Sequence, residues 1–489
     1  MVVAGAAVAG AAAARALLRR GAAVTVIDRR SSAAAEELAA AGARVVVADA
    51  PPAGLFDGAT DLVVSPGFAP HHPLVTAALA AGLEVYSEPE LAWRLRGAGA
   101  PPWLAVTGTN GKTTTVTMLA AILRAAGLRT AAVGNIGEPL VDLADHDVLA
   151  VELSSQQLYW TRSLAPAAGA LLNLAPDHLE WHGSFEAYVE AKTAIWRSAM
   201  ITKSPAGSGR SDPSRSRGVA VGNLDDPRVA RLLPAGGVGF TLGEPTGGGG
   251  APQRGAGGEL LSGQLGVVDG VLVDRTAGEV ELAPAAGIRP AGEHNVANAL
   301  AAAALARAHG VPPAAVRDGL AGYQPEPHRN SRVATVAGVT YVDDSKATNP
   351  HAALASLSAY PRVVWVAGGQ LKDVDVTELV ATVAPRLAGA VLLGADRAQI
   401  ARALARHAPR LPVVEVAGTD DGAMGEVVRA AAALAAPGDT VLLAPAAASK
   451  DMFVSYAHRG DAFAAAVSAL RSSPSDASRR PTAPPGGDR

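Results

Sequence analysis

The chain has 489 residues and no cysteine, which excludes disulfide bonds and thiolate metal sites. At about 150 residues per domain, this length indicates roughly three domains. Lysine and arginine together number 42, and aspartate and glutamate 45. The formal charge of -3 gives no overall positive field, so we expect no nucleic-acid or membrane partner, and anionic ligands must be bound by local groups.

Residues 1–97 alternate short apolar strands, at 24–27, 45–47 and 62–64, with alanine-rich helices. This alternation predicts a Rossmann-like parallel sheet that is covered on both faces. The apolar start lacks the basic segment of a signal peptide, and no stretch reaches the ~18 uncharged apolar residues of a membrane span. We therefore expect a soluble, cytoplasmic protein.

The first turn of this domain runs from Gly5 to Gly10, with Ala7 where a dinucleotide fingerprint has its second glycine. Asp28 ends the second strand, about where a ribose-binding acid falls in such domains. The turn therefore has two interpretations. Either it binds a nucleotide, or its two glycines only let the helix pack closely on the sheet.

The run 106–115, Val-Thr-Gly-Thr-Asn-Gly-Lys-Thr-Thr-Thr, lies between an apolar strand and an apolar helix. A glycine-rich turn in this position directs backbone N–H groups and Lys112 at a polyphosphate, and Thr113 offers a hydroxyl to Mg²⁺. The general P-loop pattern has a glycine where this chain has Val106. Chance occurrence in a glycine-rich chain is the alternative, but the run predicts ATP binding.

A central domain is expected over residues 98–325, with polar residues at two strand ends. Glu152 ends the apolar strand that starts at Val148, and open α/β sheets place ligands at such ends. A carboxylate with the Thr113 hydroxyl suits a hard cation, so Glu152 is a candidate magnesium ligand, although it could also only cap a buried strand. Two loops rich in Ser, Gly and Pro, 203–217 and 243–258, are expected to be mobile.

The segment 173–183 packs His178 and His182 among two acids after another apolar strand. His178 is the better candidate ligand, and a solvated loop is the alternative. Farther along, Lys192 lies on a predicted helix, where a surface lysine would be ordinary.

Residues 326–471 repeat short apolar strands, at 363–366, 390–393 and 440–443, between helices. They predict a second Rossmann-like unit at the carboxyl end, and residues 472–489 predict a disordered tail. The sequence thus indicates an α/β chain of three domains, in which a P-loop-type ATPase domain separates two Rossmann-like domains.

The loop Gly-Thr-Asn-Gly-Lys-Thr-Thr at 108–114 resembles the variant nucleotide loop of the Mur ligases and folylpolyglutamate synthetases. These are ATP-dependent enzymes that join an amino acid to a carboxylate. Pro-Asp-His at 176–178 and Gly-Glu-His-Asn-Val-Ala-Asn at 292–298 also resemble motifs of the Mur ligases, and so does Pro-His-Arg at 327–329. Asp-Ser-Lys-Ala-Thr-Asn at 344–349 is similar to the members that add D-glutamate.

The resemblance implies an amide ligase of peptidoglycan precursor synthesis, with UDP-N-acetylmuramoyl-L-alanine, D-glutamate and ATP as substrates. It implies a monomer in which ATP forms an acyl phosphate on the alanine carboxylate. Two Mg²⁺ ions and a carbamylated Lys192, which requires a neutral amine first, are further implied. The implied metal ligands are Thr113, Glu152, His178 and carbamylated Lys192, and the implied catalytic residues are Lys112, Glu152, His178 and Lys192.

The resemblance also implies the substrate contacts. For ATP these are Gly108, Thr109, Asn110, Gly111, Lys112, Thr113, Thr114, Asn295, Asn298, Arg329, Asp344 and Lys346. For the UDP-linked substrate they are Gly5, Asp28, Arg29, Ser65, Pro66, Gly67, Asn135 and Ser155. For D-glutamate they are Thr348, Lys372, Ser449 and Tyr456.

Two departures from the family pattern stand near these residues. Asn330-Ser331-Arg332 replaces an aromatic residue and an acid, and Lys450 replaces a leucine. A ligase for another amino acid or acceptor, such as L-glutamate or a folate-like substrate, is an alternative. A nucleotide-regulated binding protein that has kept the fold is a second alternative.

Overall fold

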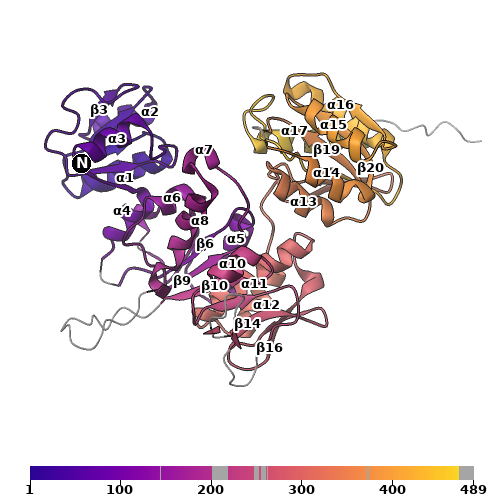
Figure 1. The fold of residues 1–489 in the computed structure, drawn as a ribbon, viewed down its shortest axis with the longest axis horizontal. Helices are drawn as coiled ribbons and strands as arrows, with labels where there is room; N and C mark the ends of the chain where they lie inside the picture. Colours follow the sequence, from indigo (N-terminus) through magenta and orange to yellow (C-terminus); the bar gives the residue numbers. More distant parts are fainter. Residues whose placement is uncertain are drawn as a thin grey trace, which may run out of the picture. The chain divides into compact units, whose positions relative to one another are not determined.

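The computed structural model describes residues 1–97, 99–143, 145–200, 218–246, 253–254, 260–261, 263–371 and 374–472 (Figure 1). The chain forms two compact units. The first comprises Met1–Ile288 and Glu293–Tyr323, and the second comprises Arg289–Gly292 and the chain from Gln324 onward. Three main sheets lie within these units, two in the first and one in the second.

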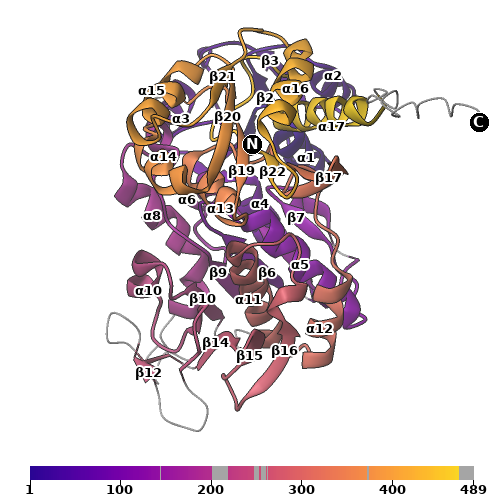
Figure 2. The ribbon, with the colours of Figure 1, turned by 90° about the vertical axis from the view of Figure 1, so that its right-hand side faces the viewer.

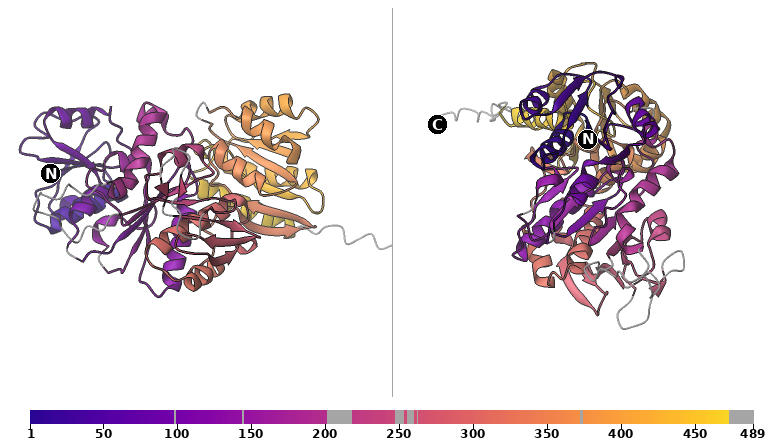
Figure 3. Two further views of the ribbon diagram at one scale, coloured as in Figure 1. Left: turned by 60° about the horizontal axis from the view of Figure 1, so that its bottom comes forward. Right: turned by 90° about the vertical axis from the view of Figure 1, so that its left-hand side faces the viewer.

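The first sheet has five parallel strands in the order β3-β2-β1-β4-β5, which is the strand order of a Rossmann-like domain. The elements of this domain are drawn in indigo and purple near the N-terminus in Figure 3. Its strands are β1 (Val2–Ala4), β2 (Thr25–Asp28), β3 (Arg44–Val47), β4 (Asp61–Val64) and β5 (Glu84–Ser87). Its helices are α1 (Val8–Arg19), α2 (Ala33–Ala40), α3 (Pro73–Ala80) and α4 (Glu88–Arg94). The strands expected near residues 25, 45 and 62 are confirmed.

The second sheet has nine strands in the order β16-β15-β14-β11-β10-β9-β6-β8-β7, of which β15 and β16 run antiparallel to their neighbours. Its strands are β6 (Trp103–Thr107), β7 (Ala132–Gly134), β8 (Leu149–Glu152), β9 (Ala168–Leu171), β10 (Val219–Asn223), β11 (Val238–Phe240), β14 (Gly263–Val268), β15 (Val271–Asp274) and β16 (Val280–Pro284). The phosphate loop joins β6, in the parallel part of this sheet, to α5 (Lys112–Ala125).

Three helices, α5, α11 (Glu293–Ala308) and α12 (Pro313–Gly322), lie side by side on this sheet (Figure 2). Alanines fill most of the buried face of α11, and their small side chains let this helix approach the strands closely. The remaining helices are α6 (Ser155–Tyr159), α7 (Leu179–His182), α8 (Phe185–Thr193), α9 (Arg197–Met200) and α10 (Pro227–Leu232), with short 3-10 turns at η1 (Leu140–Asp142), η2 (Ala194–Trp196) and η3 (Ala285–Gly287).

The two loops that the sequence marks as mobile fall mostly outside the described residues. This holds for all of 203–217 and for most of 243–258. Within the second loop, β12 (Gln253–Arg254) forms an antiparallel pair with β13 (Leu260–Leu261). The tail beyond Ser472 also lies outside the described residues.

The sheet of the second unit has six strands in the order β17-β18-β22-β19-β20-β21, and only β17 is antiparallel. Its strands are β17 (Ser331–Val336), β18 (Val339–Asp343), β19 (Val363–Gly368), β20 (Leu387–Leu393), β21 (Val413–Glu415) and β22 (Thr440–Leu443). Its helices are α13 (Pro350–Ser358), α14 (Thr377–Val383), α15 (Arg397–His407), α16 (Met424–Leu434) and α17 (Tyr456–Ser472), with η4 (Ala384–Arg386) and η5 (Asp421–Ala423). The three strands expected here are confirmed.

Buried carboxylates of α4 connect the first two sheets. The Glu90 carboxylate accepts hydrogen bonds from the backbone N–H groups of Arg162, Ser163 and Leu164 and is fully buried. Glu88 accepts another from the N–H of Val141. Hydrogen bonds to a buried carboxylate are stronger than neutral ones, so these contacts fix α4 to the second sheet.

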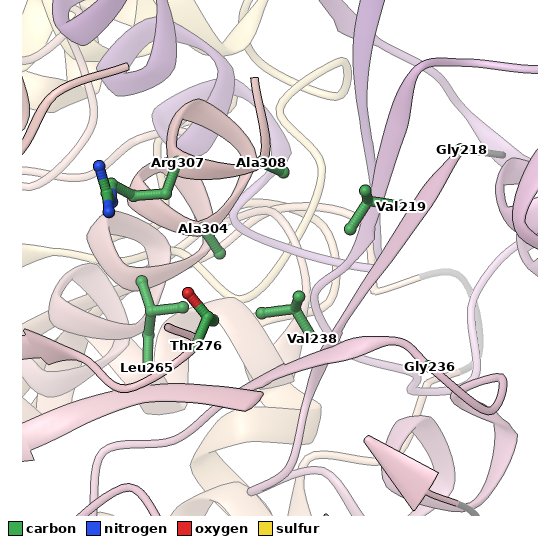
Figure 4. Close-up of a pocket in the computed structure, with 9 residues that line it drawn as sticks. All are labelled: Gly218, Val219, Gly236, Val238, Leu265, Thr276, Ala304, Arg307 and Ala308. Atoms are coloured by element: carbon green, nitrogen blue, oxygen red, sulfur yellow. The ribbon is translucent and has the colours of Figure 1, made fainter. Parts of the chain in front are cut away.

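A cavity of about 320 Å³ lies at the amino end of β10 and β11, next to the last turn of α11 (Figure 4). Val219, Val238 and Ala304 form part of its wall, with Arg307 at one side. The phosphate loop follows the carboxyl end of β6, which is parallel to these strands. The cavity, at the amino ends of the strands, therefore lies on the opposite side of the sheet from the phosphate loop. Within the described ranges, no helix has the length and apolarity needed to cross a membrane.

Candidate functional site

The phosphate loop requires both of its glycines for steric reasons. Gly111 has φ 84°, and a Cβ there would lie 2.3 Å from Asn298 Oδ1. A Cβ at Gly108 would lie 2.9 Å from the Leu172 Cβ. The loop thus packs directly against α11 and the end of β9, which brings the predicted ATP contacts Gly108, Gly111 and Asn298 together.

Side chains from neighbouring strands and helices hold this loop. Asn173 follows β9, and its Oδ1 accepts the N–H of Asn110 at 2.8 Å while its Nδ2 donates to the Asn110 carbonyl at 3.1 Å. The Thr109 hydroxyl lies 2.8 Å from the Tyr188 hydroxyl. Lys112 Nζ donates to the carbonyls of Gly108 and Thr109 at 2.9 and 2.8 Å. The sequence analysis assigned no role to Asn173 or Tyr188, although Asn173 stands at a strand end, where such a role is common.

The candidate magnesium ligands Thr113 and Glu152 are in contact. Strand β8 pairs with β6 so that Glu152 lies opposite Val106, and its Oε2 accepts the Thr113 hydroxyl at 2.6 Å. Its Oε1 accepts a hydrogen bond from Asn135 Nδ2 at 2.8 Å. A carboxylate and a hydroxyl are oxygen donors of the kind that Mg²⁺ prefers, so this pair fits the ion.

His178 is placed differently from this pair. It has φ 52°, and its side chain is 45% exposed beside Asp177 and Glu180. Across the part of the chain that the structure describes, no three histidine, aspartate or glutamate side chains form a metal-binding group. The fold therefore assembles Thr113 with Glu152 but leaves His178 in an exposed turn.

Lys192 is a buried residue of the site, so the surface-lysine alternative is wrong. It is 2% exposed, and its Nζ donates to the Gly108 carbonyl at 2.7 Å and lies 4.7 Å from the centre of the Tyr188 ring. Burial, reinforced by the positive charge of Lys112, lowers the pKa of Lys192 well below its ordinary value. Burial next to the phosphate loop therefore shifts the protonation equilibrium of Nζ toward the neutral amine.

His182, which the sequence analysis ranked below His178 as a candidate ligand, is buried, so the solvated-loop alternative is wrong for it. Its Nε2 lies 3.0 Å from the Ser155 hydroxyl, and its ring packs against Trp181 and Tyr188. Burial, with the charges of His178 and Lys192, lowers the pKa of His182 to about 4. The aromatic residues that surround it in the sequence were the available signal.

The first sheet brings Gly5, Asp28 and Ser65 together at the carboxyl ends of its strands. Asp28 Oδ2 accepts the N–H of Ala6 at 2.7 Å, and the Ser65 hydroxyl donates to the Ala4 carbonyl at 2.8 Å. A Cβ at Gly10 would lie 1.9 Å from the Gly5 carbonyl oxygen. Close packing therefore accounts for Gly10 by itself, and nucleotide binding at this turn stays a prediction.

The remaining predicted contacts of the UDP-linked substrate adjoin this turn or the second sheet. Arg29 is exposed and directly follows Asp28, while Gly67 follows Pro66 in the loop after β4. The Pro66 carbonyl accepts the indole N–H of Trp181 at 3.1 Å, which joins this loop to α7. Two indole bonds connect the sheets here, because Trp160 also donates to the Phe68 carbonyl at 3.3 Å.

At the start of α11, the predicted ATP contacts Asn295 and Asn298 touch each other. Asn298 Nδ2 donates to Asn295 Oδ1 at 3.1 Å, and Asn295 Nδ2 lies 3.0 Å from His294 Nε2. Thr114, another predicted contact, is buried in the first turn of α5. These amides therefore form one polar row beside Gly111.

In the second unit, Arg329 lies between two residues with left-handed backbone, His328 at φ 61° and Asn330 at φ 50°. Asn330 donates its backbone N–H to Asp344 Oδ1 at 3.1 Å. The Asn330 side chain accepts the Tyr360 hydroxyl at 2.6 Å and donates to the Ala291 carbonyl at 3.1 Å. At this position the resembling family has an aromatic residue, and Asn330 instead makes hydrogen bonds to Asp344, Tyr360 and Ala291. Burial raises the pKa of Asp344 to about 6.

The predicted D-glutamate contacts lie in the same unit. Lys346 Nζ is 3.8 Å from the centre of the Tyr456 ring, a cation–π contact, and the Ser345 hydroxyl donates to the Tyr456 carbonyl at 2.7 Å. Thr348 follows Lys346 in one tight turn, and Ser449 is buried. Lys372 lies outside the described residues.

Arg459 was not predicted and is almost fully buried beneath these residues. Its guanidinium donates to the Ser345 and Ala447 carbonyls at 2.9 and 3.2 Å, and to the Gly368 carbonyl at 3.3 Å. It therefore joins the ends of three strands at the predicted amino-acid site.

Family models match three parts of the chain. The model described as Mur ligase MurD-like, N-terminal domain, matches residues 1–87, the Mur ligase middle domain matches 106–236, and the Mur ligase, glutamate ligase domain, matches 328–447.

Relatives match over most of the chain. A UDP-N-acetylmuramoylalanine--D-glutamate ligase from Thermobifida fusca is 54% identical over 84% of this chain and 85% of its own. A protein of the same name from Streptomyces avermitilis is 53% identical over 86% of each chain.

Solved structures share the fold at low sequence identity. MurF from Acinetobacter baumannii has a TM-score of 0.56 at 19% identity, covering 92% of each chain. UDP-N-acetylmuramate-alanine ligase MurC from Thermotoga maritima has a TM-score of 0.55 at 16% identity, covering 96% of this chain and 99% of its own. The three-domain α/β fold expected from the sequence is confirmed.

Proposed function

Because the chain belongs to the Mur ligase family, we propose that it is an ATP-dependent ligase that adds D-glutamate to UDP-N-acetylmuramoyl-L-alanine in peptidoglycan precursor synthesis. The contact of Thr113 with Glu152 beside Lys112 is the observation that carries the ATP assignment. The names of relatives that are about half identical support the choice of D-glutamate and of the UDP-linked acceptor.

The proposed reaction has two steps. A carboxylate oxygen of the alanine attacks the γ-phosphorus of ATP, the bond to the bridging oxygen breaks, and ADP leaves. The amine of D-glutamate then attacks the acyl carbon, loses a proton, and phosphate leaves with the electron pair of its bond to carbon. Lys112 binds the γ-phosphate in this proposal, and loop glycines allow close backbone approach.

Thr113 and Glu152 would hold a magnesium ion, which neutralises charge on the phosphate oxygens. For the second ion we propose His178 and a carbamate on Lys192. The neutral Nζ favoured by burial adds to CO₂ and loses one proton, which gives an anionic oxygen ligand.

We also propose roles for the three sheets, with the UDP moiety at the first, ATP at the second and D-glutamate at the third. Arg329 would complete the ATP site by bidentate contacts to phosphate and help to exclude water from the acyl phosphate. Its two neighbours support this role, because their hydrogen bonds restrict the turn that presents it. A monomeric state and a cytoplasmic location belong to the same proposal.

The test is phosphate release coupled to mass spectrometry, with ATP, Mg²⁺, UDP-N-acetylmuramoyl-L-alanine and either D- or L-glutamate. A glutamyl product with only the D isomer is expected. Product with only the L isomer would keep the chemistry and change the substrate. Absence of product with either isomer would favour another acceptor or the nucleotide-regulated binding protein.

A further inference from the structure

The imidazole of His182 lies in a cage of aromatic rings next to the predicted substrate contact Ser155. It is 8% exposed, with ring centres at 4.5 Å from Trp181, 5.3 Å from Tyr188 and 6.1 Å from Tyr159. Its Nε2 lies 3.0 Å from the Ser155 hydroxyl oxygen. Among the residues that the structure describes, none provides a hydrogen-bond partner for the buried Nδ1.

This environment selects one form of the ring. A charged imidazolium would bury an unpaired N–H together with a positive charge, so the neutral ring is favoured. A buried N–H without an acceptor is a rarer and costlier defect than an unused acceptor. The single proton therefore belongs on Nε2, where Ser155 accepts it, and Nδ1 keeps only its lone pair.

The consequence concerns the hydroxyl of Ser155. Because its oxygen accepts from His182, its own hydrogen must point elsewhere, and the structure offers the Gln156 Oε1 at the long distance of 3.3 Å. We propose that His182 is a positioning residue that fixes the Ser155 hydroxyl as a hydrogen-bond donor toward an acceptor oxygen of the UDP-linked substrate. This inference rests on the proposed function and on the prediction that Ser155 contacts the UDP-linked substrate.

Two of the surrounding aromatic residues are themselves held by hydrogen bonds and restrict rotation of the His182 imidazole. Trp181 is held by its bond to the Pro66 carbonyl, and Tyr188 by its hydroxyl contact with Thr109 of the phosphate loop. Rotation of the imidazole would push against both rings, which interiors of protein density resist. His182 thus lies between the loop expected to bind the UDP moiety and the loop expected to bind ATP.

Steady-state kinetics of four variants test the proposal. His182→Phe removes the donor, and we expect KM for the UDP-linked substrate to rise about three- to tenfold while KM for ATP stays within about twofold. His182→Gln keeps an N–H near the position of Nε2 and should restore most of that loss. Ser155→Ala should match His182→Phe, and the double variant should be no worse than Ser155→Ala.

Two further measurements keep the test decisive. His309→Gln changes a half-buried histidine elsewhere in the first unit, directly after α11, and should leave both KM values unchanged. Thermal unfolding by circular dichroism identifies a variant that has lost its fold. If His182→Phe unfolds, the decision falls to His182→Gln, and a Gln variant as impaired as Ser155→Ala overturns the proposal.

Additive effects of the two single changes, or an equal rise in KM for ATP, would also overturn it. Failure of the proposed function gives a different result, because the wild-type enzyme would then form no product with D-glutamate. In that case calorimetric binding of UDP-N-acetylmuramoyl-L-alanine replaces KM as the readout. Equal binding by wild type and His182→Phe would then contradict the inference.

Discussion

The turn after β1 and the loop after β6 are both glycine-rich connections from a parallel strand to a helix, but they use their glycines differently. In the first, Gly10 packs against the backbone of Gly5, and Asp28 already accepts the N–H of Ala6. In the second, groups from β9, α8 and α11 surround the loop, and Gly111 faces Asn298. The spacing of glycines predicts where a chain turns. The side chains that other elements place around a turn indicate whether it can bind a ligand.

Lys112→Ala is the strongest test of whether the loop after β6, unlike the turn after β1, binds a phosphate. If the loop after β6 binds the γ-phosphate, loss of this lysine should reduce kcat/KM by about 1,000-fold or more, because one preorganised charge is removed from the transition state. Coupled phosphate release measures the rate. The Tm should change little, because Lys112 Nζ donates to the Gly108 and Thr109 carbonyls of its own loop. A near-normal rate would contradict the ATP assignment.

A matched pair of alanine substitutions separates packing from binding. Gly10→Ala places a Cβ on the Gly5 carbonyl, and we expect unfolding to become easier by about 3 kcal/mol in urea titrations. Gly111→Ala costs about 1–2 kcal/mol for its left-handed backbone. It also displaces Asn298, so KM for ATP should rise at least about tenfold. The comparison fails if Gly10→Ala alters KM for ATP as strongly as Gly111→Ala does.

Lys192→Met tests whether the buried amine of Lys192, which contacts the loop after β6, destabilises the fold but is needed for turnover. The Gly108 carbonyl would still accept Lys112 Nζ, so no buried acceptor is lost, and the unfolding free energy should increase by about 1 kcal/mol while turnover is lost. Lys192→Arg is a poor control because a guanidinium stays positively charged, whereas burial disfavours the charged form of Lys192. The better control is Met200→Lys on an exposed site of α9, which should leave both stability and turnover unchanged.

The pH dependence of stability provides an independent check on the same lysine. The pKa of Lys192 is lowered in the folded protein, so between that value and the ordinary one the unfolded chain binds more protons. Stability contributed by this group therefore rises as pH increases through that window. Urea unfolding between pH 7 and 10 should show a steeper rise for wild type than for Lys192→Met. Equal slopes would mean that the amine is charged in the folded state.

The sequence predicted the elements that depend on local pattern, and it failed where distant segments meet. Apolar strands and the turn 108–111 follow from periodicity and glycine placement, so parallel strands in each of the three sheets were predictable, whereas the antiparallel strands β15 and β16 were not predicted. The burial of Lys192 was not predictable, because a lysine on a short helix is polar by local pattern, and the burial of His182 was signalled only by the aromatic residues near it in the sequence. Their neighbours lie on β6, β8 and α6. The spacing of residues along the sequence does not show that these elements meet in the fold.

The same limit applies to the second unit. Asn330 departs from the family pattern, and the sequence alone indicated only altered packing there. Its two side-chain bonds join Tyr360 and Ala291, which are 30 and 39 residues away. Arg459 likewise binds carbonyls that are 12 to 114 residues distant. Polar residues that serve as long-range connections leave no periodic signal.

The smallest and most discriminating prediction concerns Asp28. Asp28→Asn keeps an oxygen that can accept the N–H of Ala6, so the turn after β1 should lose less than about 1 kcal/mol of stability. If the carboxylate also binds the UDP-linked substrate, KM for that substrate should rise about threefold or more while KM for ATP stays constant. If neither value changes, the carboxylate only caps the turn. The first glycine turn would then be a packing device, and substrate binding at this sheet would depend on Ser65 and its loop.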